Sequence, residues 1–258
     1  MAQRSDDNPA SRCGRHRNTG LRPRAGAAVG LQRCVRSLHG SRHPTTRIAY
    51  MTATLELKNL ECTRGERQLF TALNAVVPSR ALLRVNGANG AGKTSLLRTV
   101  CGLLTPSAGE VRWRGQPAVG MREEFSRELL YLGHAPALKN DLTPVENLLV
   151  ACTLGGTRPT PSSATAALAR AGLGGYEATP SRHLSQGQRK RVALARLELD
   201  TAVPLWVLDE PFNALDANAS AWLVSLLTTH LARGGIVVLT SHQPVDFPSD
   251  VAQLGVSL

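Results

Sequence analysis

The sequence predicts an α/β fold built on a doubly wound parallel sheet, with a helical insertion at about residues 135–185. Three observations support this prediction. Short apolar segments of strand character alternate with segments of helical character from Met51 onward. Two of the strand-like segments, 204–208 and 236–239, are continuously apolar, as strands covered on both faces are. A glycine-rich loop at 87–95 joins a strand to a helix.

The elements follow from local patterns along the chain. Strands are predicted at residues 54–60, 69–77, 81–85, 110–113, 129–132, 204–208 and 236–239. Helices are predicted at residues 95–100, 144–151, 164–171, 186–199 and 218–231. The first strand alternates apolar and polar residues, and Pro144 takes the first helical position after the cap Thr143. Gly172 and the pair Gly234-Gly235 end two of the helices.

The first fifty residues differ in composition from the rest of the chain. They hold ten of the 30 Lys and Arg residues and two of the 19 acids, so residues 51–258 carry only +3 of the total charge of +11. We expect this Arg-rich segment to be disordered. It is either sequence translated from an over-long start choice or a targeting peptide. The nearly neutral remainder, 51–258, is the expected folded domain and gives no indication of a nucleic-acid surface.

The cysteines and the hydropathy exclude two classes of protein. The five cysteines are scattered, odd in number and contain no C-x-x-C pair, so the sequence predicts neither a disulfide framework nor a cysteine metal site. A reducing compartment is therefore expected. No apolar run approaches the roughly 18 residues of a membrane span, so any membrane role is expected to come through a partner.

A phosphate-binding loop is the clearest motif. The pattern G-x-x-x-x-G-K-S/T is matched by Gly87-Ala88-Asn89-Gly90-Ala91-Gly92-Lys93-Thr94-Ser95. Glycines let the backbone curl until its N–H groups point at a phosphate, and the helix start adds donors and a positive dipole end. We expect Lys93 to reach the β- and γ-phosphates of ATP and the Thr94 hydroxyl to ligate Mg²⁺.

Two acids, Asp209 and Glu210, directly follow an apolar strand. An acid at the carboxyl end of a buried strand beside a phosphate loop can hold Mg²⁺, so we expect Asp209 to do this directly or through water. Glu210 is expected to polarise or orient the attacking water. The two motifs together predict a P-loop NTPase.

A third motif, Leu184-Ser185-Gln186-Gly187-Gln188, stands before a predicted helix. It resembles the signature loop of ATP-binding-cassette (ABC) ATPases, usually Leu-Ser-Gly-Gly-Gln, and departs from it at Gln186. The resemblance covers 51–258 and implies a RecA-like core, an antiparallel β-subdomain and a helical subdomain. It also implies two copies that sandwich two ATP molecules, with Ser185, Gly187 and Gln188 facing the ATP of the other copy. The basic run 189–191 is expected to be a solvated helix face.

Further roles follow from the same resemblance. The segment 213–216 resembles the D-loop that crosses the dimer, and His242 resembles the switch histidine that contacts the γ-phosphate, which makes Glu210 and His242 the expected catalytic residues. His134 stands where the family usually has the Q-loop glutamine, and a neutral imidazole could reach Mg²⁺ or its water. The expected metal ligands are therefore Thr94, Asp209 and His134.

The aromatic residue that usually stacks on adenine is missing. Arg64 or a neighbour occupies its region of the sequence, and a guanidinium plane can stack on a base. A solvated turn arginine is an equally open interpretation of Arg64. We count Arg64 among the expected nucleotide-binding residues.

Within the ABC ATPases, the chain resembles the ATP-binding subunit of the haem exporter of cytochrome c maturation. This resemblance lies in the segments 130–139, 142–143, 184–188, 191–196 and 206–212. It implies an ATPase coupled to transport, a homodimer of such subunits, and separate integral membrane partners that are CcmB-like and CcmC-like. Haem is the implied indirect cargo. The implied location is peripheral, on the cytoplasmic face of the bacterial inner membrane or, alternatively, at the mitochondrial inner membrane.

Two other functions stay open at this stage. The chain could be the ATPase of another ABC exporter with a different cargo. It could also be a soluble ABC ATPase that acts on nucleic acid or ribosomes. Such proteins usually carry two cassettes in one chain or an added arm, whereas this sequence has one phosphate loop and a nearly neutral body.

Overall fold

The computed structural model describes residues 54–258, and the predictions for residues 1–50 lie outside that range. Its strands are β1 (Thr54–Arg64), β2 (Arg67–Pro78), β3 (Ala81–Asn86), β4 (Ala108–Trp113), β5 (Gln116–Pro117), β6 (Leu129–Leu132), β7 (Leu205–Leu208), β8 (Ile236–Thr240) and β9 (Ala252–Ser257). Its helices are α2 (Lys93–Val100), α3 (Arg122–Arg127), α4 (Pro144–Leu154), α5 (Pro161–Arg170), α6 (Gln186–Leu199) and α7 (Ala217–Ala232), with the 3₁₀ turns η1 (Ala118–Met121) and η2 (Ser181–His183).

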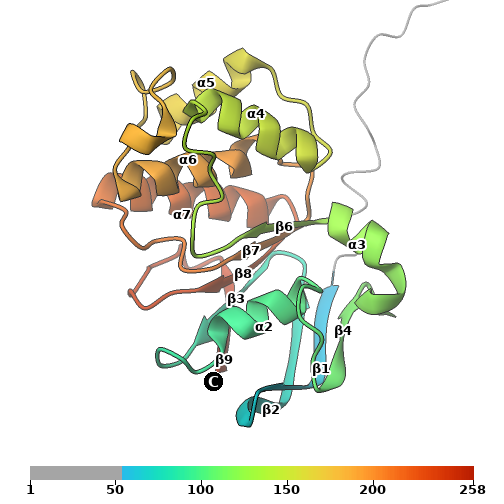
Figure 1. Cartoon of the computed structure of the whole chain (residues 1–258). Coiled ribbons are helices and arrows are strands. Elements are labelled where there is room, and N and C mark those ends of the chain that lie inside the picture. Colours follow the sequence, from blue (N-terminus) through green and yellow to red (C-terminus); the bar gives the residue numbers. More distant parts are fainter. Residues whose placement is uncertain (1–53) are drawn as a thin grey trace, which may run out of the picture. The chain divides into compact units, whose positions relative to one another are not determined.

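The strands form two sheets (Figure 1). The antiparallel sheet has the order β2-β1-β4-β5, and the parallel sheet has the order β6-β7-β8-β3-β9. In the antiparallel sheet β1 pairs with both β2 and β4. Gly109 allows β4 to pass close to a bulge of β1, because a Cβ there would lie 2.2 Å from the carbonyl oxygen of Asn59. Residues 54–258 contain no helix with the length and apolar character of a membrane span.

The parallel sheet is covered on both faces, which explains the continuous apolar runs of its central strands. Leu205 and Val207 of β7 belong to one buried cluster with α2 and the antiparallel sheet, whereas Trp206 and Leu208 belong to another with α6 and α7. In Figure 1, α2 accordingly lies on the side of the antiparallel strands, and α6 and α7 lie across the parallel sheet from it. This arrangement confirms the predicted α/β fold class.

A third apolar cluster packs α4, α5 and α6 against one another, with Leu148, Leu168 and Val192 among its buried members. Helices α4 and α5 lie within the predicted helical subdomain at about residues 135–185. Helix α4 begins at Pro144 as predicted, and Thr143 caps it in a reciprocal capping box with Glu146.

Most predicted elements agree with the structure within a few residues, and α6 agrees at both ends. Helix α5 begins three residues before its predicted start, because Thr160 supplies the cap and Pro161 takes the first position. Helix α3, the strands β5 and β9 and the turns η1 and η2 have no counterpart among the predictions. Helix α3 has only six residues, and β9 is an exposed edge strand that pairs with β3 alone, so neither shows a burial period in the sequence.

Helix α7 places a buried histidine against the parallel sheet. The imidazole of His230 stacks on the indole of Trp206 with 3.7 Å between the ring centroids, and His230 is only 3% exposed. Gly235 permits this packing, because a Cβ there would lie 2.1 Å from His230 Nε2. Burial lowers the pKa of His230 from 6.5 to about 4, since the charged ring would lose its hydration.

We therefore predict that acid destabilises the fold through His230. Below pH 6.5 the unfolded chain binds a proton at this imidazole, whereas the folded protein binds it only near pH 4. Stability that is fully present above pH 6.5 is thus lost as the pH falls through this window, by roughly 3 kcal/mol at most. Urea unfolding at about pH 7.5 and about pH 5 measures the effect. The variant His230→Gln should lose less stability between the two pH values than the wild type, and equal losses would contradict the prediction.

Candidate active site

The phosphate loop, residues 87–95, connects β3 to α2. Gly87, Gly90 and Gly92 have φ values of 149°, 79° and 108°, which glycine adopts without strain. Gly92 is the N-cap of α2 and no side chain caps this helix, so the first N–H groups can be offered to a phosphate. Lys93 folds back over the loop, where its Nζ donates to the carbonyl oxygens of the first two loop residues at 2.9 and 3.0 Å.

A cavity of about 440 Å³ lies beside this loop and is called the phosphate cavity below. Its lining consists of Asn89, Gly90, Gly92, Lys93, Thr94 and Ser95 from the loop, Arg64, Arg67 and Leu69 from the antiparallel sheet, and Glu210. Arg64 and Glu210 therefore line the same cavity as the predicted phosphate-binding residues of the loop. Gly87, Ala88 and Ala91 belong to the loop but do not line the cavity. Its cationic side chains favour a polyanionic ligand.

Asp209 is buried at the end of β7 and is held by residues from three elements. Its Oδ2 accepts a hydrogen bond from Thr94 Oγ1 at 2.8 Å, and its Oδ1 accepts one from Thr240 Oγ1 at 2.8 Å. Its backbone N–H donates to the carbonyl oxygen of Leu132 at 2.9 Å. The structure thus brings together the two oxygen ligands, Thr94 and Asp209, that the sequence predicts for Mg²⁺.

Glu210 follows with a φ of 48°, in the left-handed region. Its carboxylate lies between two histidines, with Oε1 3.1 Å from His242 Nε2 and Oε2 3.6 Å from His134 Nδ1. Asn213 Nδ2 also donates to Oε2. The predicted catalytic residues Glu210 and His242 are therefore in contact, and His134, expected beside the metal, lies against Glu210.

The signature residues Ser185, Gly187 and Gln188 stand at the start of α6, and none of them lines the phosphate cavity. Ser185 is the N-cap: its Oγ accepts from the Gln188 N–H at 3.2 Å, while Gln188 Oε1 accepts from the Ser185 N–H at 2.8 Å. This capping box fixes the first turn of α6. Within one copy, the phosphate cavity and the signature turn are therefore separate.

Gly187 lies against the loop that precedes α7. A Cβ at this position would lie 2.6 Å from the carbonyl oxygen of Ala214, so a larger residue requires the loop to move. Gln186, in contrast, is exposed and lines a second cavity of about 460 Å³ together with His134 and Asn213. His134 and Gln186, two of the departures from the usual ABC pattern, thus line one cavity.

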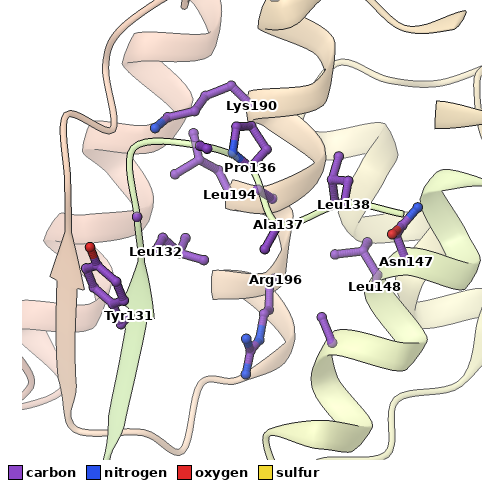
Figure 2. A pocket seen from close by; sticks show the side chains of 14 residues that line it. Tyr131, Leu132, Pro136, Ala137, Leu138, Asn147, Leu148, Lys190, Leu194 and Arg196 are labelled. Atoms are coloured by element: carbon purple, nitrogen blue, oxygen red, sulfur yellow. The ribbon is translucent and has the colours of Figure 1, made fainter. Parts of the chain in front are cut away.

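Lys190 of α6 also contacts the site, through the backbone of Asp209. A pocket of about 90 Å³ separates α6 from the segment after β6, and Figure 2 shows Lys190 and Leu194 on one side of it with Pro136 close by. Lys190 is only 7% exposed, so the expectation of a solvated helix face is wrong at this position. Its Nζ donates to the Asp209 carbonyl oxygen at 3.4 Å. Burial lowers the pKa of Lys190, while the carboxylates of Asp209 and Glu210 act in the opposite direction.

Sequence reasoning did not identify Thr240 and Lys190 as part of this site. A signal for Thr240 exists, because it is the polar residue at the carboxyl end of an otherwise apolar strand, where parallel sheets place ligand-binding groups. Lys190 carries no such signal. Its burial depends on how α6 packs against the end of β7, and a basic run on a helix is usually solvated.

The comparisons agree with this fold. Residues 70–213 match the family model described as ABC transporter, which is more than half of the chain. The chain belongs to the ABC transporter ATP-binding family, and it is accordingly the ATP-hydrolysing component of a transporter. Among solved structures, an ABC transporter ATP-binding protein from Pyrococcus furiosus aligns with a TM-score of 0.67 at 22% identity, over 78% of this chain and 96% of that one.

The chain is also similar to particular members of that family. The cytochrome c biogenesis ATP-binding export protein CcmA of Aromatoleum aromaticum is 53% identical over 76% of this chain and 92% of the relative. CcmA of Methylococcus capsulatus is 50% identical over 80% of this chain and 99% of the relative. The solved dimeric ATP-binding cassette MJ0796, with ADP and Pi bound, has the same fold, with a TM-score of 0.62 at 23% identity over 73% of this chain and 88% of that one.

We predict that Gly187→Ala disrupts the contact between the signature turn and the loop before α7, because the new Cβ would meet Ala214 at 2.6 Å. ATP turnover should fall by about tenfold or more, whereas nucleotide binding should persist, since Gly187 does not line the phosphate cavity. Steady-state ATPase assays and nucleotide titration measure the two effects. Gly174→Ala is the matched control, because a Cβ there meets nothing within 4 Å. Equal turnover in both variants would contradict the prediction.

Proposed function

We propose that this chain is the ATP-hydrolysing subunit of an export system for c-type cytochrome biogenesis, in which a separate membrane subunit handles haem. Five relatives named as cytochrome c biogenesis ATP-binding export proteins support this, at 44–53% identity. They align over 76–80% of this chain and 92–99% of their own length. The ATPase role rests on one observation above all, the 2.8 Å contact that joins Thr94 of the phosphate loop to Asp209.

The donor set at this contact suits Mg²⁺. This ion prefers oxygen ligands, one or two from the protein and the others from water and substrate phosphates. Thr94 Oγ1 and Asp209 Oδ2 offer such a pair, and within residues 54–258 no cluster of three or more His, Cys, Asp or Glu could form a metal cage alone. When bound, Mg²⁺ supplies charge neutralisation at the β- and γ-phosphate oxygens. His134 is the candidate for a ligand that acts through water, because its ring lies at Glu210.

The other site residues have separate roles in binding and hydrolysing ATP. The loop residues 87–95 bind the triphosphate through backbone N–H groups, and Lys93 balances the charge of the β- and γ-phosphates. Glu210 orients the attacking water, while His242 holds Glu210 at 3.1 Å and contacts the γ-phosphate. Arg64 stacks on the base at the edge of the same cavity. Catalysis is then mainly positioning and charge stabilisation.

A second copy completes the site. Ser185, Gly187 and Gln188 lie outside the phosphate cavity of their own copy, so they are available to the ATP of another. The solved cassette of the same fold is described as dimeric, which supports a homodimer here. We propose that residues 51–258 form the ATPase domain, and that its helical subdomain at about 135–185 moves the signature turn toward the partner copy.

Membrane partners and location follow from this function. We propose separate integral membrane subunits, CcmB-like and CcmC-like, which the closing dimer would drive. The chain would then be peripheral on the cytoplasmic face of the bacterial inner membrane. The alternative of a mitochondrial inner membrane depends on residues 1–50, whose composition is compatible with a targeting peptide.

We predict that Glu210→Gln binds ATP but turns it over very slowly, at least about a hundredfold below the wild type. The amide keeps the shape of the side chain but cannot accept the proton of the attacking water. A closed dimer should accumulate with ATP and be visible by size-exclusion chromatography. Lys93→Ala serves as the comparison, because it should lose most nucleotide affinity and form no such dimer. Wild-type turnover in Glu210→Gln would refute the proposed role of this residue.

Purification from detergent-solubilised membranes tests the transport assignment. The tagged full chain with Glu210→Gln and ATP should retain membrane subunits of the CcmB and CcmC kinds, and Lys93→Ala should retain fewer of them. Mass spectrometry identifies the retained proteins. Recovery of the membrane subunit of a different exporter, or of ribosomes, would contradict the haem assignment while leaving the ATPase assignment intact.

A further inference from the structure

We propose that Thr240 is a positioning residue for ATP hydrolysis, whose single buried hydroxyl fixes the carboxylate of Asp209 and the backbone of Glu210 at the same time. This inference rests on the metal-binding and water-orienting roles proposed for Asp209 and Glu210. Thr240 itself does not line the phosphate cavity, so it acts on the reaction only through these two residues.

The sheet topology places Thr240 at this point. Strand β8 lies between β3, which leads into the phosphate loop, and β7, which leads into the two acids. The parallel register pairs Leu208 with Leu239, so Asp209 and Thr240 are the next residues along adjacent strands. Thr240 has no exposed surface. Its Oγ1 donates to Asp209 Oδ1 at 2.8 Å and accepts from the Glu210 N–H at 2.8 Å.

The first bond selects one orientation of the Asp209 carboxylate. Oδ1 is bound by Thr240 and Oδ2 by Thr94, so neither oxygen can rotate away without losing a 2.8 Å hydrogen bond. Asp209 is almost fully buried, and a buried carboxylate oxygen without a donor is unfavourable. Without the Thr240 hydroxyl the carboxylate would turn toward other donors. The oxygen that faces Thr94 would then no longer be set for Mg²⁺.

The second hydrogen bond, from the Glu210 N–H to Thr240 Oγ1, supports an unusual backbone conformation at Glu210. Glu210 has a φ of 48°, a conformation that residues with a Cβ rarely adopt. Because the Thr240 hydroxyl accepts the Glu210 N–H, this conformation does not leave a backbone donor unsatisfied. The same conformation directs the carboxylate of Glu210 between His134 and His242. One hydroxyl group therefore aligns both the metal ligand and the residue that orients water.

The test is a pair of substitutions in the full chain. Thr240→Val keeps the shape of the side chain and removes the hydroxyl, whereas Thr240→Ser keeps the hydroxyl and removes a methyl group. Loss of a supporting hydrogen bond behind a metal ligand lowers activity by roughly 10- to 100-fold, and we expect this fall in kcat for Thr240→Val. The Mg²⁺ concentration for half-maximal activity should rise, and nucleotide affinity measured without Mg²⁺ should stay near that of the wild type. Thr240→Ser should restore kcat to near the wild-type value.

Thr157→Val is the matched control. Thr157 also donates its hydroxyl to a buried carboxylate, that of Asp200, but neither residue lines the phosphate cavity. This variant should lose stability in thermal unfolding while its kcat and Mg²⁺ dependence remain near the wild type. A merely structural role for Thr240 would give it the same profile as Thr157→Val.

The outcomes separate the two levels of the proposal. A folded Thr240→Val with wild-type kcat and Mg²⁺ dependence overturns the role of Thr240, and so does a Thr240→Ser variant as slow as Thr240→Val. If Thr240→Val does not fold, Thr240→Ala is measured in its place against the same criteria. Wild-type turnover in Glu210→Gln would instead show that the underlying assignment of the site is wrong.

Discussion

The hydrogen bond between Thr94 and Asp209 is the contact on which the site depends. It joins residues 115 positions apart in the chain, and it can form because β3, β8 and β7 are neighbouring parallel strands whose carboxyl ends meet at one edge. The buried side chains on both faces of this sheet hold the strands in register. The phosphate cavity, the proposed metal ligand Asp209 and the residue proposed to orient water, Glu210, therefore lie at a single sheet edge.

Asp209 and Lys190 at this edge are buried and Glu210 is partly buried, so each needs a partner. Asp209 has Thr94, Thr240, Lys190 and the backbone of Leu132 around it, and Glu210 has two histidines and Asn213. In a medium of low polarity such contacts are strong, and an unpaired group would be destabilising. The left-handed backbone of Glu210 adds about 1–3 kcal/mol of strain, which the surrounding contacts offset. The result is a preorganised site.

The sequence predicted the α/β class, most elements and the main motifs because each of these leaves a local trace. The phosphate loop, Asp209 and the helix α6 are visible as glycine spacing, an acid after an apolar run and a strong helical segment. Thr240 and Lys190 were not identified, because their importance comes from strands and helices that meet only after folding. The position of His134 at Glu210 likewise depends on how the segment after β6 turns, which no local pattern encodes.

Gln186 has a practical consequence for testing the proposed dimer. It is exposed, while its neighbour Gly187 is confined by Ala214. The cysteines of the described range make poor nucleophiles, because burial raises the thiol pKa of Cys62, Cys101 and Cys152. A cysteine introduced at position 186, with Cys13 and Cys34 replaced, would thus accept a spin label selectively. If the proposed dimer forms, pulsed dipolar spectroscopy would then measure the separation of two such labels with and without ATP.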